Sequence, residues 1–234
     1  MKREDNIFIV GTDTGAGKTV LSLLLMQYFY GKGRSPFYLK PIQTGCENPY
    51  DTDSDACFIY HHLKPLGDKD PAESVIYCFR NPKAPYFAAR DEGKEIHIKK
   101  ILEVAAEKNA LYAPVILEAA GGLLVPVTEK LLMIDLISLT GTKPLIAARA
   151  GLGTINHTLL TVEALMRRKI PPLGVVLIDA GRSETPPEMV QENTEAIERG
   201  SEVKVAGVVG FIRNFSRPPQ SCYKPLEKIF GANR

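Results

Sequence analysis

Residues 7–26 read IFIVGTDTGAGKTVLSLLLM, which is an apolar run, a glycine-rich loop and an apolar helix in direct succession. The loop GTDTGAGKT suits a phosphate group, because glycines let backbone N–H groups turn inward and a helix N-terminus adds positive potential. Lys18 can reach the β- and γ-phosphates, and the Thr19 hydroxyl can bind Mg²⁺. The strict Walker pattern of a P-loop has glycine where this chain has Thr12, so the loop matches a variant of that pattern that is one residue longer. The stretch predicts a nucleotide-binding P-loop rather than an ordinary glycine-rich turn.

Outward from this stretch, short apolar runs alternate with amphipathic segments, which is typical of parallel strands joined by crossover helices. We therefore expect an α/β fold of the P-loop NTPase type, with a doubly wound, mostly parallel sheet and helices on both faces. Residues 46–95 fit the alternation poorly, apart from a possible edge strand at 74–79, and residues 217–234 are expected to form a docked tail. The expected strands are 7–10, 37–39, 115–117, 144–147, 175–178 and 208–212, and the expected helices are 19–30, 98–109, 131–140, 155–168 and 187–199.

Length and composition favour one domain over residues 1–234, since 44% of the residues are hydrophobic and 24% are charged. The 29 basic and 27 acidic residues are scattered, so we expect no nucleic-acid partner. No apolar run approaches the roughly 20 residues of a membrane span, and the chain enters a strand at once, so we expect a cytoplasmic protein without a membrane partner. The four cysteines and the neighbouring His61 and His62 lack the spacing of a zinc site.

The carboxyl ends of parallel strands meet at the edge of the sheet where ligands bind, and three further motifs follow predicted strands. The first is KPIQTG, residues 40–45. Lys40 in the crevice would be costly without an anion partner, although an ordinary surface lysine is the alternative. Thr44 and the flexible Gly45 are suited to holding an oxyanion.

The second motif is VILEAAGG, in which Glu118 ends a predicted strand. With Asp55 from the acidic loop DTDSDA, Glu118 would supply the oxygen ligands that a Mg²⁺–nucleotide complex needs. Asp51 and Asp53 remain alternatives to Asp55. The third motif, ARAGLGTINHT, has exposed amides at residues 153–156 that could bind a carboxylate, or its threonine could simply cap the following helix.

The order and wording of these motifs resemble the dethiobiotin synthetase family across roughly residues 7–180. The matching stretches are GTDTGAGKT, KPIQTG followed by DSDA, LEAAGG followed by LVPVT, and AGLGTINHTLLT, and the segment PKAPYFAARDEGKEI is also similar. The resemblance implies an ATP-dependent cyclo-ligase that converts 7,8-diaminononanoate and CO₂ into dethiobiotin, ADP and phosphate. In that chemistry a carbamate forms on one amine, accepts the γ-phosphoryl group, and is then attacked by the second amine.

The resemblance also implies a role for each matching residue. Lys40 would hold and polarise the carbamate, Thr44 would hydrogen-bond it, and Thr14 would position the transferring phosphoryl group together with Lys18. Mg²⁺ would be bound by Thr19, Asp55 and Glu118. The substrate carboxylate would lie on Gly153, Thr154, Ile155 and Asn156 of the other subunit of a homodimer. ATP would be bound by Gly15, Ala16, Gly17, Lys18, Thr19, Val20, Asp55, Glu118, Ala119, Ala120, Gly121, Ile178, Asp179, Arg213, Asn214 and Phe215.

The chain departs from the family pattern at a few positions. Gly15 stands where many members have an acidic residue, and Ala119 replaces a glycine. The base-binding Asn of the family is Ile178 here and its Pro is Arg213, which predicts weak selection for the base.

Three other protein classes fit the sequence less well. A related amidotransferase of cobalamin synthesis would need room for a glutaminase domain. Partitioning ATPases carry an extra lysine where this chain has Asp13. A nucleotide sensor without turnover would have no use for the second anion site that Lys40 and Thr44 suggest.

Overall fold

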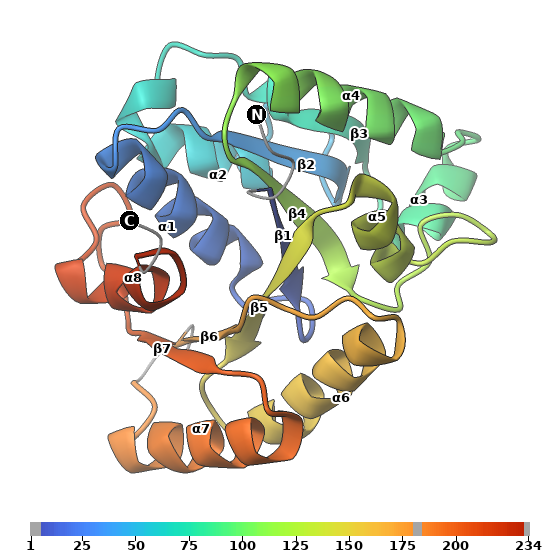
Figure 1. Cartoon of the computed structure of the whole chain (residues 1–234). Coiled ribbons are helices and arrows are strands. Elements are labelled where there is room, and N and C mark those ends of the chain that lie inside the picture. The colour runs from blue at the N-terminus through green and yellow to red at the C-terminus, as the bar shows by residue number, and fades with distance from the viewer. Residues whose placement is uncertain (1–5, 180–183, 232–234) are drawn as a thin grey trace.

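The computed structural model describes residues 6–179 and 184–231, and its strands form a single parallel sheet (Figure 1). Seven strands lie in the order β3–β2–β4–β1–β5–β6–β7, and neighbouring strands run parallel. The expected parallel sheet is confirmed, and residues 75–79 do form its edge strand. The strands are β1 (Ile7–Gly11), β2 (Phe37–Thr44), β3 (Val75–Phe79), β4 (Val115–Gly122), β5 (Lys143–Arg149), β6 (Val175–Ile178) and β7 (Val205–Val209).

Helices cover both faces of the sheet, and each face has its own apolar core. Because successive strand residues point to opposite faces, Ile7 and Ile9 of β1 pack on one side and Phe8 and Val10 on the other. The first side is covered by α1 (Lys18–Gly31), α2 (Asp55–His62) and α8 (Lys224–Phe230). The second is covered by α3 (Pro85–Asp91), α4 (Ile98–Leu111), α5 (Met133–Thr140), α6 (Thr154–Arg167) and α7 (Pro187–Ser201).

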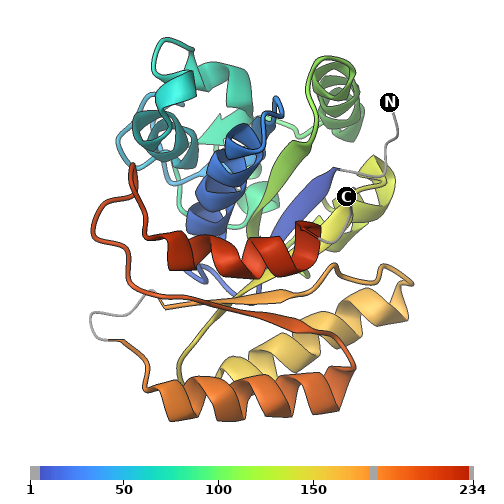
Figure 2. The same ribbon diagram turned by 60° about the vertical axis from the view of Figure 1, so that its left-hand side comes forward.

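The C-terminal segment docks against the first face, as expected for the tail. Figure 2 shows α8 lying across the sheet near α1. The ring of Phe230 packs edge-on against Phe29 of α1, with 5.3 Å between the ring centroids. No helix among residues 6–179 and 184–231 is long and apolar enough to span a membrane.

Beyond shifts of one or two residues at the ends of several elements, the structure differs from the sequence expectation in three main respects. Helices α2 and α3 lie in the segment that fitted the alternation poorly; each is only 7 or 8 residues long, too short to show a clear helical period. Strand β7 begins and ends three residues before the expected 208–212, because Gly207 interrupts the apolar run without breaking the strand. Strands β2 and β4 extend further than expected, so Lys40 and Glu118 lie within strands rather than at their ends.

This extension opens the sheet at the level of Lys40 and Glu118. The pairing of β2 with β4 ends at Leu39 and Leu117, directly before these two residues. From Lys40 onward β2 pairs only with β3, while β4 continues along β1. The two strands thus separate toward the carboxyl edge, and the side chains of Lys40 and Glu118, directly after the separation, lie on the face covered by α1.

The loop between β1 and α1 is held close to the sheet by Gly17. This residue has a φ of +88°, in the left-handed region that favours glycine, and a Cβ atom built there would lie 2.6 Å from Cγ2 of Ile178 in β6. Ile178 itself is 2% exposed. The loop therefore needs both a glycine backbone and the absence of a side chain at this position.

We expect Gly17→Ala to lower the free energy of unfolding by roughly 2–6 kcal/mol, because the left-handed backbone and the overpacking each cost a non-glycine residue about 1–3 kcal/mol. Urea denaturation would measure the change. In an Ile178→Ala background the added cost of Gly17→Ala should shrink but not vanish, since the contacts with Cγ2 and Cγ1 are removed while Cβ of residue 178 remains 2.8 Å away. Strictly additive effects of the two substitutions would contradict this account.

Candidate functional site

The phosphate loop lies between β1 and α1, with its lysine folded back onto the loop. Gly15 and Gly17 both have left-handed backbones, with φ values of +70° and +88°. Lys18 is buried, and its Nζ donates a hydrogen bond to the Asp13 carbonyl at 3.1 Å. Burial lowers the pKa of Lys18, and the positive charge of Lys40 lowers it further. An anion bound in the loop would offset both effects.

Four side chains from four different elements meet beside this loop. Lys40 Nζ of β2 lies 2.6 Å from Asp55 Oδ2 of α2 and 2.8 Å from Glu118 Oε1 of β4. The Thr19 hydroxyl of α1 lies 2.8 Å from Asp55 Oδ1 and 3.0 Å from Glu118 Oε1. The three residues expected to bind Mg²⁺ and Lys40, expected to hold the carbamate, therefore form one connected cluster.

The charges of this largely buried cluster stabilise one another. Burial alone would lower the pKa of Lys40, but the negative charges of Asp55 and Glu118 and the hydrogen bonds to them outweigh burial and raise it. Burial raises the pKa of Asp55, and Lys40 reverses that effect, so the carboxyl pKa is lowered overall. The lysine is therefore a cation and Asp55 an anion at neutral pH.

Two further residues, which the sequence did not point to, orient Glu118. Its Oε2 atom accepts hydrogen bonds from Ser22 Oγ at 2.7 Å and from the Tyr38 hydroxyl at 3.1 Å. Both partners are buried. With Oε2 held in this way, Oε1 faces Lys40 and Thr19. These contacts join residues 80 to 96 positions apart, so local sequence patterns carry no signal for them.

Asp55 is positioned by Gln43, whose Oε1 atom accepts a hydrogen bond from the Asp55 backbone N–H at 3.2 Å. The alternative aspartates lie elsewhere. Asp51 accepts hydrogen bonds from the backbone N–H groups of Glu47 and Asp53, within its own loop. Asp53 is exposed. Of the three, Asp55 is the one in contact with Thr19.

A cavity of about 580 Å³ surrounds the cluster and contains most of the expected site residues. Segment 82–85, which leads into α3, closes the side away from the phosphate loop. Ala16 and Ala119 do not line the cavity, although the Ala119 carbonyl accepts a hydrogen bond from Lys40 at 3.2 Å. The lining residues are Thr14, Gly15, Gly17, Lys18, Thr19, Val20, Lys40, Gln43, Thr44, Asp55, Pro82, Lys83, Ala84, Pro85, Glu118, Ala120, Gly121 and Val125.

The residues expected near the base lie outside this cavity. Ile178 is buried beneath Gly17, and both carboxylate oxygens of Asp179 accept hydrogen bonds from Thr185, through its N–H at 2.7 Å and its hydroxyl at 3.1 Å. Arg213 and Asn214 are exposed after β7. The Phe215 carbonyl accepts a hydrogen bond from Gln27 of α1 at 2.8 Å.

The turn before α6 also lies outside the cavity. Gly153, with a φ of +91°, is the N-cap of α6, and no side chain caps the helix there. Thr154 is the first helical residue, and its hydroxyl lies 3.3 Å from that of Thr158. The simple alternative, in which Thr154 caps the helix, is therefore wrong. Asn156 is exposed, as is Leu152, at 94%.

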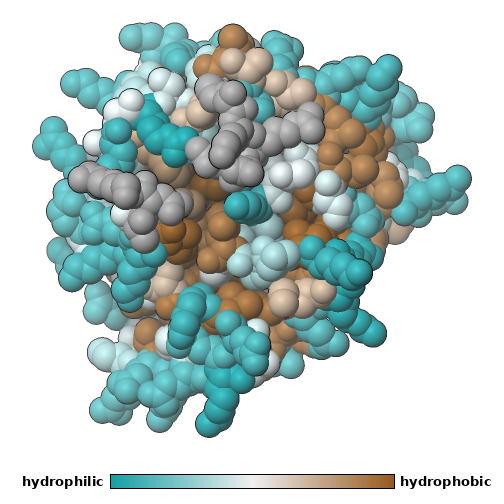
Figure 3. Space-filling model, viewed as in Figure 1, coloured by the Kyte–Doolittle hydropathy of each residue, from teal (hydrophilic) through white to brown (hydrophobic). Residues whose placement is uncertain are grey.

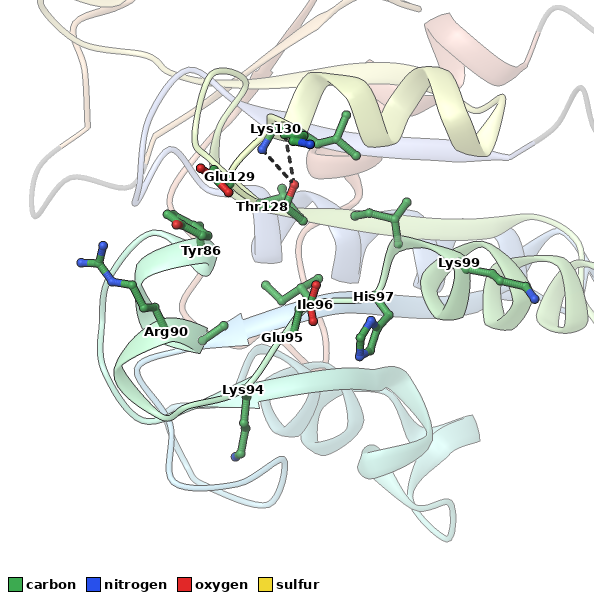
Figure 4. Close-up of a pocket in the computed structure, with 14 residues that line it drawn as sticks. Tyr86, Arg90, Lys94, Glu95, Ile96, His97, Lys99, Thr128, Glu129 and Lys130 are labelled. Atoms are coloured by element: carbon green, nitrogen blue, oxygen red, sulfur yellow. Dashed lines mark hydrogen bonds between the residues drawn. The ribbon is translucent and has the colours of Figure 1, made fainter.

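A second, larger cavity of about 670 Å³ lies on the other side of α3 (Figure 4). Its apolar floor includes Ala89, Ile96 and Val127, and Figure 4 shows the charged side chains of Arg90, Lys94 and Lys99 reaching away from it. No residue of the phosphate loop lines it. The chemistry-bearing groups are in the smaller cavity, which we take as the candidate active site.

Fold and phosphate loop together define a P-loop nucleotide-binding protein. Residues 5–219 match the family model described as an AAA domain. Among solved structures, the chain is similar to the MinC:MinD cell division complex of Aquifex aeolicus, with a TM-score of 0.60 and 14% identity over 98% of this chain and 97% of that one. A ParA family ATPase of Chlorobium tepidum matches with a TM-score of 0.52 and 12% identity over 97% and 94%. At these identities the likeness shows the fold alone.

Curated relatives give the family. An ATP-dependent dethiobiotin synthetase of Anaeromyxobacter dehalogenans is 40% identical over 77% of this chain and 79% of its own, and one of Hydrogenobaculum is 39% identical over 73% and 75%. A bifunctional biotin biosynthesis protein of Bordetella avium is 38% identical over 87% of this chain and 39% of its own. The chain belongs to the ATP-dependent dethiobiotin synthetase family.

The charge cluster predicts a large difference between two lysines at this site. We expect Lys40→Met to lower the free energy of unfolding by about 3–5 kcal/mol, because it leaves the buried carboxylate of Glu118 and the partly buried one of Asp55 without their cation. Lys83→Met is the matched control, since Lys83 pairs with Asp91 at the surface and should contribute at most about 1 kcal/mol. Chemical denaturation at neutral pH would measure both. Equal effects would mean that Lys40 does not neutralise the cluster.

Proposed function

We propose that this protein synthesises dethiobiotin from 7,8-diaminononanoate and CO₂ with the hydrolysis of ATP to ADP and phosphate. The observation that carries the proposal is that Lys40 and Thr44 line the same cavity as the phosphate loop. A phosphoryl transfer between two anions needs a second positive group next to the nucleotide, and Lys40 is a buried cation at that position. The family membership supplies the identity of the substrates.

The residues beside the loop fit a bound Mg²⁺ ion. Mg²⁺ prefers carboxylate and hydroxyl oxygens, and the Thr19 hydroxyl lies within hydrogen-bonding distance of the carboxylates of both Asp55 and Glu118. We assign these three residues to the metal. When bound, the ion would neutralise charge on the phosphate oxygens during transfer.

The other side chains serve the reacting groups. Lys18 and the loop amides hold the triphosphate, and Thr14, exposed at the rim of the loop, positions the terminal phosphoryl group. Lys40 and Thr44 hold the carbamate that forms when one substrate amine adds to CO₂. Because Lys40 is already fixed by two carboxylates, little reorganisation is needed when negative charge develops near it.

The reaction then follows from this placement. A carbamate oxygen attacks the γ-phosphorus, and the bond from that phosphorus to the β–γ bridging oxygen breaks, releasing ADP. The second substrate amine attacks the carbamate carbon and loses a proton. The carbon–oxygen bond to the phosphoryl group breaks, which closes the ureido ring and releases phosphate.

We further propose a two-fold homodimer in which residues 153–156 of one subunit complete the substrate site of its partner. Supporting this, large apolar side chains are exposed on the loop after β4, on the turn before α6 and on α6 itself: Leu124 at 60%, Leu152 at 94% and Leu160 at 57%. Figure 3 shows patches of apolar surface among hydrophilic residues on the face where Figure 1 shows α5 and α6. Free amides at the start of α6 would bind the substrate carboxylate.

The product assay tests the activity directly. Purified protein with Mg²⁺, ATP, bicarbonate and 7,8-diaminononanoate is expected to form dethiobiotin, detected by mass spectrometry, and to release ADP only when both carbon substrates are present. ADP release that is independent of the diamine and stimulated by DNA or a partner protein would instead indicate a switch ATPase, the class that shares this fold.

Subunit mixing tests the shared site. Lys18→Ala and Asn156→Ala proteins should each be nearly inactive, the first through lost triphosphate binding and the second through lost substrate binding. After subunit exchange, one of the two sites in each hybrid dimer carries neither change, so activity should rise to a sizeable fraction of wild type. No rescue, with exchange verified by native mass spectrometry, would argue against a site built from two subunits.

A further inference from the structure

Arg149, the last residue of β5, lies beside the phosphate loop. Gly11 of β1 pairs with Ala147, and the Thr12 N–H donates to the Ala147 carbonyl at 3.1 Å, so Arg149 lies level with the loop residues that follow. Leu145 and Ala147 face the core beneath α1. By the alternation of a strand, Arg149 points to the same face, which is the face of the phosphate loop.

The guanidinium contacts the middle of the loop. Its Nη2 donates a hydrogen bond to the Thr14 carbonyl at 3.1 Å. A Cβ atom built on Gly15 would lie 3.4 Å from the same nitrogen. Thr14 and Gly15 both line the candidate active site, and Lys18 reaches the same loop from the helix. The loop thus has a cation on each side.

Arg149 has donors to spare. A guanidinium carries five N–H groups and cannot lose its charge. Among residues 6–179 and 184–231, the guanidinium of Arg149 makes one hydrogen bond, the one to the Thr14 carbonyl, and no described carboxylate forms an ion pair with it. The Asp13 carboxylate accepts the Thr14 N–H instead, at 2.7 Å.

A purely structural role explains this arrangement poorly. The bond to Thr14 is exposed, and water would satisfy an exposed carbonyl equally well. The carbonyl does fix the side chain in place, and a fixed, exposed guanidinium beside a phosphate loop matches the geometry of phosphate recognition.

We propose that Arg149 is a phosphate-binding residue that contacts the terminal phosphate of ATP and stabilises the charge on it during transfer. The role of Arg149 during phosphoryl transfer rests on the proposed function. Its role in binding the terminal phosphate does not. In other phosphoryl-transfer enzymes an arginine supplied by the same chain serves the same end. Here the strand adjoining β1 supplies it.

Nucleotide titration separates this role from a structural one. ADP and the non-hydrolysable analogue adenylyl imidodiphosphate are titrated into wild type, Arg149→Ala and Arg149→Lys with Mg²⁺ present. We expect Arg149→Ala to weaken analogue binding about 10–100-fold while ADP binding changes little, because only the analogue has a terminal phosphate. Arg149→Lys should fall between, since it keeps the charge and loses the planar fork. Equal loss for both nucleotides, or no loss, would overturn the assignment.

Turnover gives the second readout. We expect kcat of Arg149→Ala to fall about 10²–10³-fold, with partial recovery on adding guanidinium at concentrations that leave the unfolding midpoint unchanged. Arg199→Ala is the control, because Arg199 is exposed in the last turn of α7, lines neither cavity and should behave as wild type. A rise in KM for the diamine with unchanged kcat would place Arg149 at the substrate carboxylate and overturn the proposal. If wild type forms no dethiobiotin, the proposed function fails, while the titration still decides the role of Arg149.

Discussion

The ion pairs of Lys40 with Asp55 and Glu118 hold the candidate site together. They join β2, α2 and β4, and the Thr19 hydroxyl ties the same two carboxylates to α1. Each charge would be costly to bury alone, and the cluster is stable only because opposite charges lie within 3 Å of one another. The same arrangement places a permanent cation and a set of oxygen ligands beside the phosphate loop. Stability and chemistry therefore depend on the same contacts.

The space for this cluster comes from the way the sheet divides. Strands β2 and β4 stop pairing after Leu39 and Leu117, so the next residues of each strand are free of the ladder between them. Ser22 and Tyr38 then fix Glu118 from behind, and Gln43 fixes the start of α2. Because the pairing of β2 with β4 ends at this point, Lys40 and Glu118 contribute to the candidate site although both lie within strands.

The similarity to MinD and ParA proteins shows the fold alone, and one fold can serve many functions. The function proposed for this chain is based instead on residues in and beside its phosphate loop. These are Asp13 within the loop, Lys40 and Thr44 in the cavity, and Arg149 at the end of β5. Function in this fold is thus decided by the residues at the carboxyl ends of a few strands.

The sequence by itself determined the fold class, the phosphate loop and the identity of most residues in the cavity, because these depend on local periodicity and on short motifs. It also pointed to Asp55, Glu118 and Lys40, yet placed the last two at strand ends and left Asp51 and Asp53 open. Only the tertiary structure decided that Lys40 neutralises both carboxylates, that Ser22 and Tyr38 orient Glu118, and that Arg149 reaches Thr14. Those contacts join residues 15 to 135 positions apart in the chain. They form only when separate strands and helices pack together, so a local sequence pattern cannot predict them.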